Sequence, residues 1–285
     1  MAAGTPWWAK IVAKLALSRL PVDYRQWVKL RIFRHGSMAD PQYALGVFRN
    51  HLAQACLQEE IFRGLCLEIG PGDSLLTAVA AHAAGFSGTL LVDTGAWAQR
   101  NVQQLRAVAV EEGVGAERTG RWTTFEEALT DLNAHYLPTG IDALRALPGA
   151  SVSFAFSQAV LEHIRKGEYQ EFLQQLYRIL EPGSLSSHRV DLQDHLSKGL
   201  NNLRFSDRVW ESDFFASSGF YTNRLGLRDH VEAFEAAGFI IEKLVSDRFP
   251  VLPLPRTRMA TRFRTRSDEE LLVCGFDIVV RKPCT

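Results

Sequence analysis

Apolar and polar positions alternate in two ways along this chain, and the two patterns predict an α/β fold. Between residues 61 and 183, short apolar runs of strand length are separated by stretches with apolar positions at helical spacing. Strands that alternate with helices favour a parallel sheet. The predicted strands are 65–69, 89–93 and 151–157, and the predicted helices are 100–110, 124–134 and 167–180.

Further elements are expected on both sides of this region. After it, the pattern predicts strands at 187–192, 239–245 and 271–281 and a helix at 228–237. Before it, residues 1–60 are expected to be helical, with a first helix that ends at Pro21 and a second at 24–33. We therefore expect a helical cap at 1–60 and one large domain at 61–285, with an acceptor-binding insertion at about 192–227.

The first 35 residues carry many basic side chains and three tryptophans, Trp7, Trp8 and Trp27. Basic residues and tryptophan on an amphipathic helix are typical of contact with an anionic membrane surface. A helical cap packed over the domain explains the same pattern, and the two interpretations are compatible. Residues 1–35 are thus candidates for peripheral membrane contact.

Composition limits the class of protein. The 285 residues are 46% hydrophobic, which is enough for a large core, and the formal net charge of +0 gives no field that favours nucleic acid. The four cysteines have no C-x-x-C spacing, and Cys66 and Cys274 lie in apolar strand patterns, so we expect buried thiols and a reducing cytoplasm. The alternative location is the inner face of the membrane. We expect neither a spanning segment nor a signal peptide, because apolar runs are short and Lys10 and Lys14 interrupt the first one.

The most informative segment runs from residue 65 to residue 74. A buried strand is expected to end in a turn in which Gly70 and Gly72 allow tight bending and close approach to a ligand. Asp73 and Ser74 are expected to cap the helix that follows. Asp93 ends the next strand, roughly 20 residues later, at the spacing typical of an acid that binds ribose hydroxyls.

The sequence Glu68-Ile69-Gly70-Pro71-Gly72 resembles motif I of class I S-adenosylmethionine-dependent methyltransferases. A dehydrogenase fingerprint is not indicated, because Leu75 stands where it has a further glycine, and no Gly-Lys-Ser/Thr of a phosphate loop follows. Residues 151–163 resemble the family's fourth strand and the turn after it, and 176–183 resemble its approach to the fifth strand. Ser153 and Ser184 depart from residues that are usual in the family.

The resemblance implies a Rossmann-like fold with a mostly parallel seven-stranded sheet, the last strand reversed, helices on both faces and, in this chain, the N-terminal helical cap. It implies S-adenosylmethionine as the cofactor. Asp142 resembles the acid that holds the adenine amino group. The cofactor-binding candidates are Glu68, Gly70, Pro71, Gly72, Asp73, Ser74, Asp93, Thr94, Asp142, Ser157 and Gln158.

The acceptor is expected beside the second half of the same sheet edge. His188, Asp191 and His195 are the most prominent polar group there, with His163 as a further candidate. A histidine with a carboxylate partner is suited to take a proton from an acceptor hydroxyl. Two histidines and an aspartate are also a divalent-metal ligand set, and a purely structural role is the third interpretation. We assign these residues as catalytic candidates and assign no metal.

The predicted function is methyl transfer to a hydroxyl of a sugar, a glycan or another small molecule. Residues 33–36 and 221–224 resemble bacterial methyltransferases linked to surface polysaccharides, and aromatic residues with amides in the 201–223 segment suit a ring-bearing acceptor. The alternative is a non-catalytic, nucleoside-binding scaffold that is recruited to a membrane surface. A homo-oligomer is compatible with either.

Overall fold

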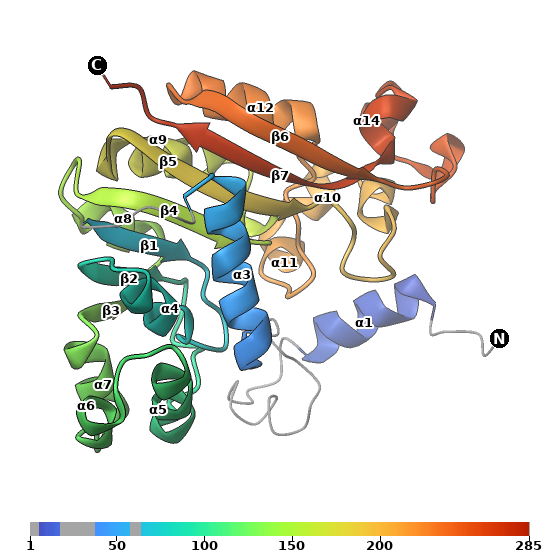
Figure 1. The fold of residues 1–285 in the computed structure, drawn as a ribbon. Helices are drawn as coiled ribbons and strands as arrows, with labels where there is room; N and C mark the ends of the chain where they lie inside the picture. The colour runs from blue at the N-terminus through green and yellow to red at the C-terminus, as the bar shows by residue number, and fades with distance from the viewer. Residues whose placement is uncertain (1–5, 18–37, 58–63, 285) are drawn as a thin grey trace.

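Seven strands form one sheet in the order β3-β2-β1-β4-β5-β7-β6 (Figure 1). The computed structural model describes residues 6–17, 38–57 and 64–284. β7 is antiparallel to both of its neighbours and the other pairs are parallel, as expected for a mostly parallel sheet with the last strand reversed. The strands are β1 (Leu65–Ile69), β2 (Gly88–Val92), β3 (Ala134–Leu137), β4 (Val152–Gln158), β5 (Leu180–Asp191), β6 (Ile240–Arg248) and β7 (Val273–Arg281).

Helices cover both faces of the sheet, and each face has its own apolar core. Phe154 and Phe156 of β4 point into one core, while Ala155 between them points into the other, because side chains alternate along a strand. The first core takes α3 (Pro41–Gln54), α4 (Thr77–Ala83), α5 (Val102–Glu111) and α7 (Phe125–Asp131). The second takes α8 (Ile141–Ala146), α9 (Tyr169–Ile179) and α12 (Leu227–Ala236). The Rossmann-like α/β prediction is therefore confirmed.

The helix after the glycine turn begins later than predicted. α4 starts at Thr77, and no side chain caps its first turn. The Asp73 carboxylate instead accepts a hydrogen bond from the Ala39 amide at 3.0 Å, and so ties the turn to the residues before α3. The capping prediction for Asp73 and Ser74 was wrong because a partner distant in sequence takes the carboxylate.

The helix predicted at 124–134 is also shorter than expected. α7 ends at Asp131, and Asn133 adopts a φ of 50° before β3 begins at Ala134. The Asn133 side chain donates to the Ser87 carbonyl at 2.7 Å, which anchors this left-handed residue beside the start of β2. The third strand, which the sequence defined poorly, thus occupies the end of the predicted helix.

Short elements fill the region between β5 and α12 and the region before β7. They are η2 (Asn201–Arg204), α10 (Asp207–Trp210), α11 (Asp213–Ala216), η3 (Arg256–Arg258), α13 (Thr261–Arg264) and α14 (Asp268–Leu272), while α6 (Ala116–Gly120) precedes α7.

The first helix, α1 (Trp7–Leu17), lies away from the sheet, on the side of α11 (Figure 1). Its Ile11 is buried in a cluster with Leu196, Trp210 and Phe220. The predicted helix at 24–33 lies outside the described residues, and the cap at 1–60 stays a prediction. Among the described residues, every helix is too short or too polar to span a lipid bilayer.

Candidate active site

The carboxyl ends of β1, β2, β4 and β5 lie along one edge of the sheet, since these strands are parallel. Gly70 and Gly72 follow β1 with φ angles of 73° and 68°, in the left-handed region that favours glycine. A Cβ on Gly70 would lie 2.4 Å from Cγ2 of Val160, which follows β4. Only glycine fits at Gly70 without displacing Val160.

The structure brings the glycine turn and the predicted acid together. The Gly72 amide donates to Oδ2 of Asp93 at 3.0 Å, and the Thr94 amide donates to Oδ1 of the same carboxylate at 2.7 Å. The Asp93 backbone carbonyl accepts from the Gly140 amide at 2.7 Å, so the residues after β3 join the same edge. The half-buried carboxylate therefore faces the turn at the position where the prediction requires it.

The other acid predicted to bind the nucleoside lies in a different environment. Asp142 is in the first turn of α8, just after Gly140. Its exposed carboxylate forms an ion pair with Arg145 at 2.6 Å. The structure thus places Asp142 at the correct edge of the sheet, and its contact with adenine stays a prediction.

Four predicted cofactor ligands are buried and support the turn from within. Glu68 accepts a hydrogen bond from the Thr77 hydroxyl, and burial raises the pKa of its carboxyl to about 8. Asp73 and Ser74 are buried, and Ser74 Oγ accepts from the Leu76 amide at 3.3 Å. Pro71 is buried as well. These side chains shape the turn from within, and the half-buried Asp93 carboxylate lies beside it.

His188, a predicted base, lies in the core and not at the edge. It is fully buried, with Nδ1 2.7 Å from Ser157 Oγ and Nε2 2.7 Å from Ser186 Oγ. Burial, together with the nearby His51 and His230, lowers the pKa of His188 to about 3. With both nitrogens bonded to serines, His188 has no nitrogen left for an acceptor proton. The sequence predicted a strand only from residue 187, but β5 begins at Leu180, so His188 lies inside the strand.

Ser157 and Gln158 belong to the same buried polar layer. Gln158 Oε1 lies 3.2 Å from Nε2 of His51, whose Nδ1 lies 2.8 Å from Ser187 Oγ. Burial lowers the pKa of His51 to about 4. His51 comes from α3, and no local motif marks it in the sequence. Ser157 therefore supports the sheet edge, and Gln158 is held by a residue that sequence reasoning missed.

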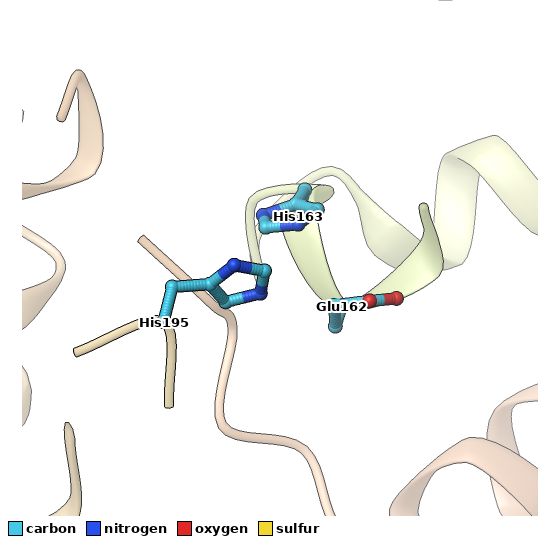
Figure 2. Close-up of side chains that lie close together, drawn as sticks. All are labelled: Glu162, His163 and His195. Carbon is cyan, nitrogen blue, oxygen red and sulfur yellow. The ribbon is translucent and has the colours of Figure 1, made fainter. Parts of the chain in front are cut away.

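Glu162, His163 and His195 form a polar cluster at the ends of β4 and β5 (Figure 2). The two imidazole rings are 4.8 Å apart between centroids. Nδ1 of His163 donates to the Tyr221 carbonyl at 2.8 Å. Glu162 is buried, and its Oε1 accepts from the Asp191 amide at 3.4 Å. His163 lies in the short 3-10 turn η1 (Leu161–His163), where a longer helix was expected.

The cluster includes a residue that was not predicted. Burial, together with the Asp191 charge, raises the pKa of Glu162 to about 8. In the sequence, Glu162 is one polar residue beside His163, and its burial follows from the tertiary fold. A carboxyl that is protonated near neutral pH, next to two histidines, is the kind of environment found at functional sites.

A crevice of about 430 Å³ opens beside this cluster. It is lined by Lys10, Asp191, Asp194, His195, Leu196, Ser197 and Lys198. Asp191 accepts from the Gln193 amide at 2.9 Å, and Asp194 accepts from the Ser197 amide at 2.6 Å, so both acids also shape the loop after β5. The crevice has the predicted catalytic residues Asp191 and His195 in its wall.

α1 closes one side of this crevice. Lys10 Nζ donates to the Leu196 carbonyl at 2.6 Å, and Lys14 Nζ donates to the His195 carbonyl at 3.3 Å. Both lysines of the described helix thus contact the loop after β5.

The aromatic residues of the 201–223 segment mostly pack against one another. Trp210, Phe220 and Tyr221 are buried, and the Trp210 indole donates to the Thr222 carbonyl at 2.7 Å. Phe214 is 52% exposed. The ordinary packing interpretation therefore describes most of this cluster better than an aromatic surface for a sugar.

No family model and no curated protein matches the chain. Solved structures that resemble it include S-adenosylmethionine-dependent methyltransferases. One, from Mesorhizobium loti, is 16% identical, with 86% of this chain and 98% of that chain covered and a TM-score of 0.45. Another, the Burkholderia thailandensis 1,6-didemethyltoxoflavin N1-methyltransferase with S-adenosylhomocysteine, is 13% identical, with 99% and 92% covered and a TM-score of 0.47. A Haloferax volcanii methyltransferase in complex with the activator Trm112 is 15% identical, with 86% and 96% covered and a TM-score of 0.45.

Proposed function

We propose that this chain is a class I methyltransferase that transfers a methyl group from S-adenosylmethionine to a hydroxyl of a small molecule or glycan. The observation that supports the proposal most directly is the contact between the Gly72 amide and the Asp93 carboxylate at 3.0 Å. This contact joins a backbone turn that a ligand can approach closely to a carboxylate that can bind ribose hydroxyls. Both lie at the edge where open α/β sheets bind nucleosides.

The residues at this edge fit the cofactor. The turn at Gly70 and Gly72 has no side chain that would block a nucleoside, and the Asp93 carboxylate would accept hydrogen bonds from ribose hydroxyls. Thr94 and Asp142 would extend the site toward the adenine. When bound, the cofactor supplies a methyl group on a positively charged sulfur.

The acceptor is proposed to lie in the crevice beside His195. Two carboxylates, an imidazole, a serine and two lysines line it, and such hydrogen-bonding groups suit a ligand rich in hydroxyls. A bound cofactor would supply its methyl carbon to the acceptor oxygen, and its sulfur would keep the electron pair of the broken carbon–sulfur bond as a neutral thioether. The hydroxyl proton goes to His195, which is exposed and neutral, and Asp191 helps to orient the acceptor.

The non-catalytic membrane scaffold gains no support from the described part of α1. Lys10 and Lys14 contact loop carbonyls beside the crevice, so these two cations are directed toward the protein. Glycan recognition and any membrane contact of residues 1–35 remain parts of the proposal.

Calorimetry tests the proposed binding of the cofactor, and a methyl-transfer assay tests the proposed reaction. We expect S-adenosylmethionine to bind the wild type and to bind Asp93→Ala at least tenfold more weakly, because the ribose loses its acceptor. Glu117→Gln is the control, since Glu117 forms an exposed ion pair with Arg121 away from this edge. Equal affinity in wild type and Asp93→Ala would remove the proposed nucleoside site.

Radiolabelled methyl should pass to a hydroxyl-bearing extract with the wild type, and the rate of methyl transfer should fall 10²- to 10⁴-fold in His195→Ala.

A further inference from the structure

We propose that Glu162, His163 and His195 form a binding site for one divalent transition-metal ion at the edge of the crevice. Each residue offers one ligand atom, and these atoms all lie within 4.8 Å of one another (Figure 2). Two come from the turn after β4 and one from the loop after β5, so the fold and not the local sequence brings them together. The proposal that these residues bind a metal does not depend on the proposed methyl transfer; only the role of the ion does.

The buried carboxylate is the first argument for an ion. Glu162 is 1% exposed, and its Oε1 accepts a long bond from the Asp191 amide at 3.4 Å. Its Oε2 is buried without a hydrogen-bond partner among the described residues. A buried polar atom without a partner costs free energy. A cation held by this cluster would give the Glu162 carboxyl a charged partner.

The hydrogen bond of His163 is the second argument. A carbonyl can only accept, so the contact with the Tyr221 carbonyl fixes the ring proton on Nδ1. In the neutral ring the lone pair is then on Nε2. Histidine ligands of metals commonly donate their other ring nitrogen to a carbonyl or carboxylate, which sets the tautomer and orients the ring. His163 therefore has the outer contact that a metal ligand needs.

The donor set selects the class of metal. Imidazole nitrogens with one carboxylate suit Zn²⁺, Mn²⁺ or Co²⁺, whereas Ca²⁺ and Mg²⁺ prefer oxygen ligands. Metal–ligand bonds of about 2.1 Å require donors that are roughly 3.4 Å apart in a tetrahedral site. The donors would therefore have to move closer by up to about 1.4 Å. The imidazoles of His163 and His195 are exposed, while Glu162 is buried.

The role of the ion rests on the proposed function. Three protein ligands leave coordination positions open, and His195 lines the crevice proposed for the acceptor. An acceptor hydroxyl bound to the ion loses its proton more readily. With the ion bound, His163 and His195 would act as ligands, so Asp191 instead of His195 would take the acceptor proton as the acceptor oxygen bonds to the methyl carbon and the carbon–sulfur bond breaks.

Cobalt binding to the metal-stripped full chain tests the site. We expect one equivalent of Co²⁺ by equilibrium dialysis, with a visible absorption band from imidazole and carboxylate ligands. Affinity should fall at least tenfold in His195→Ala and in His163→Ala, and also in Glu162→Gln. His135→Ala is the control, because His135 is an exposed histidine that contacts the side chain of Asn133, away from the cluster. Its affinity and spectrum should match those of the wild type.

The outcomes separate the two proposals. Thermal unfolding and S-adenosylhomocysteine binding show whether each variant is folded, and His195→Ala, which removes an exposed ring, gives the decisive comparison. Absence of Co²⁺ binding at 100-fold excess, or equal binding in wild type and a folded His195→Ala, would overturn the metal site. Tight Co²⁺ binding that His195→Ala abolishes, without methyl transfer to any acceptor, would retain the metal site and contradict only the proposed function.

Discussion

The two halves of the sheet edge are built in different ways. In the half that follows β1 and β2, the backbone makes the site: Gly70 and Gly72 lie in the left-handed region, and one carboxylate, Asp93, bonds the turn. In the half that follows β4 and β5, side chains from separate segments make the site, and Glu162 and His195 meet beside a crevice that α1 borders. The first half depends on the shape of one backbone turn. The second half, called the assembled half below, depends on side chains that the fold brings together from separate segments.

This contrast separates what a mutation does in each half. A change in the glycine turn acts through sterics and should alter binding and stability together. A change in the assembled half should act through charge, protonation or hydrogen bonding, and its effect depends on whether the side chain is buried or lines the crevice. His188 and His195 belong to one stretch of chain but fall on opposite sides of this division.

The largest effect is expected from Gly70→Ala, compared with Gly113→Ala. Both glycines have positive φ, 73° and 86°, so both substitutions cost about 1–2 kcal/mol of backbone strain. At Gly70 the new Cβ also overlaps Val160, whereas at Gly113 nothing lies within 4 Å. We expect Gly70→Ala to lower the unfolding free energy by about 3 kcal/mol in total. We also expect it to weaken the binding of S-adenosylhomocysteine.

Chemical denaturation and calorimetry measure both quantities. Gly113→Ala should bind with the affinity of the wild type, because it lies away from the edge. If Gly70→Ala were no less stable than Gly113→Ala, the tight approach of the turn to Val160 would not exist in solution.

The second effect concerns a buried histidine and pH. His188 has a pKa of about 3 in the folded chain, against about 6.5 when unfolded. Below pH 6.5 the unfolded state binds a proton that the folded state does not, so stability falls as pH falls toward the folded pKa. Between pH 7 and pH 5, His188 should account for a loss of roughly 2 kcal/mol.

The variant His188→Gln isolates this contribution. Subtracting its unfolding free energy from that of the wild type at each pH cancels the other groups that titrate. The difference should decrease by about 2 kcal/mol from pH 7 to pH 5. A difference that does not change with pH would mean that the pKa of His188 is the same in the folded and the unfolded chain, and His188 would again be a candidate base.

The same contrast explains how much the sequence revealed. Most strands, the glycine turn and Asp93 were predictable, because each depends on residues close in sequence or on a known spacing between two strands. The third strand and the start of β5 were not predicted. The Asp73 cap and the end of α7 were not, since Ala39 and Ser87 supply partners from other segments. Burial of a polar side chain depends on what the fold places around it.

The assembled half was predicted only in part. His163, Asp191 and His195 were selected as candidates, and the structure places them at one edge of the sheet. Glu162 was missed because a single glutamate in a sequence carries no sign that it will be buried. His51 was missed for the same reason, since its partners come from β4 and β5.

A third, smaller effect tests whether the aromatic segment is scaffold or binding surface. Trp210→Phe removes the hydrogen bond from the indole to the Thr222 carbonyl and leaves a small cavity. We expect a loss of about 2 kcal/mol in unfolding free energy and an unchanged KM for the acceptor. Phe214→Ala, at a 52% exposed ring, should leave stability within about 0.5 kcal/mol of the wild type. A raised KM in Phe214→Ala with stability unchanged would show that the aromatic segment binds the acceptor after all.

The smallest effect concerns α1 and compares two lysines of one helix. Lys10 donates a partly buried hydrogen bond at 2.6 Å to the Leu196 carbonyl, and Lys14 donates an exposed one at 3.3 Å to the His195 carbonyl. Methionine keeps the aliphatic chain and removes the charge. Lys10→Met should lower the unfolding free energy by about 1 kcal/mol, and Lys14→Met should leave it nearly unchanged.

Vesicle sedimentation then separates the cap from the membrane anchor. If α1 serves only to border the crevice, neither variant should change the sedimentation of the protein with phosphatidylserine vesicles. If its charges serve an anionic lipid surface, each lysine removed should weaken vesicle binding by about 1 kcal/mol, and Lys14→Met should do so without loss of stability. Lys14→Met is the decisive variant, because Lys14 contributes little to the stability of the fold. Weaker vesicle binding with unchanged unfolding free energy would assign this helix to the membrane, and unchanged vesicle binding would assign it to the crevice.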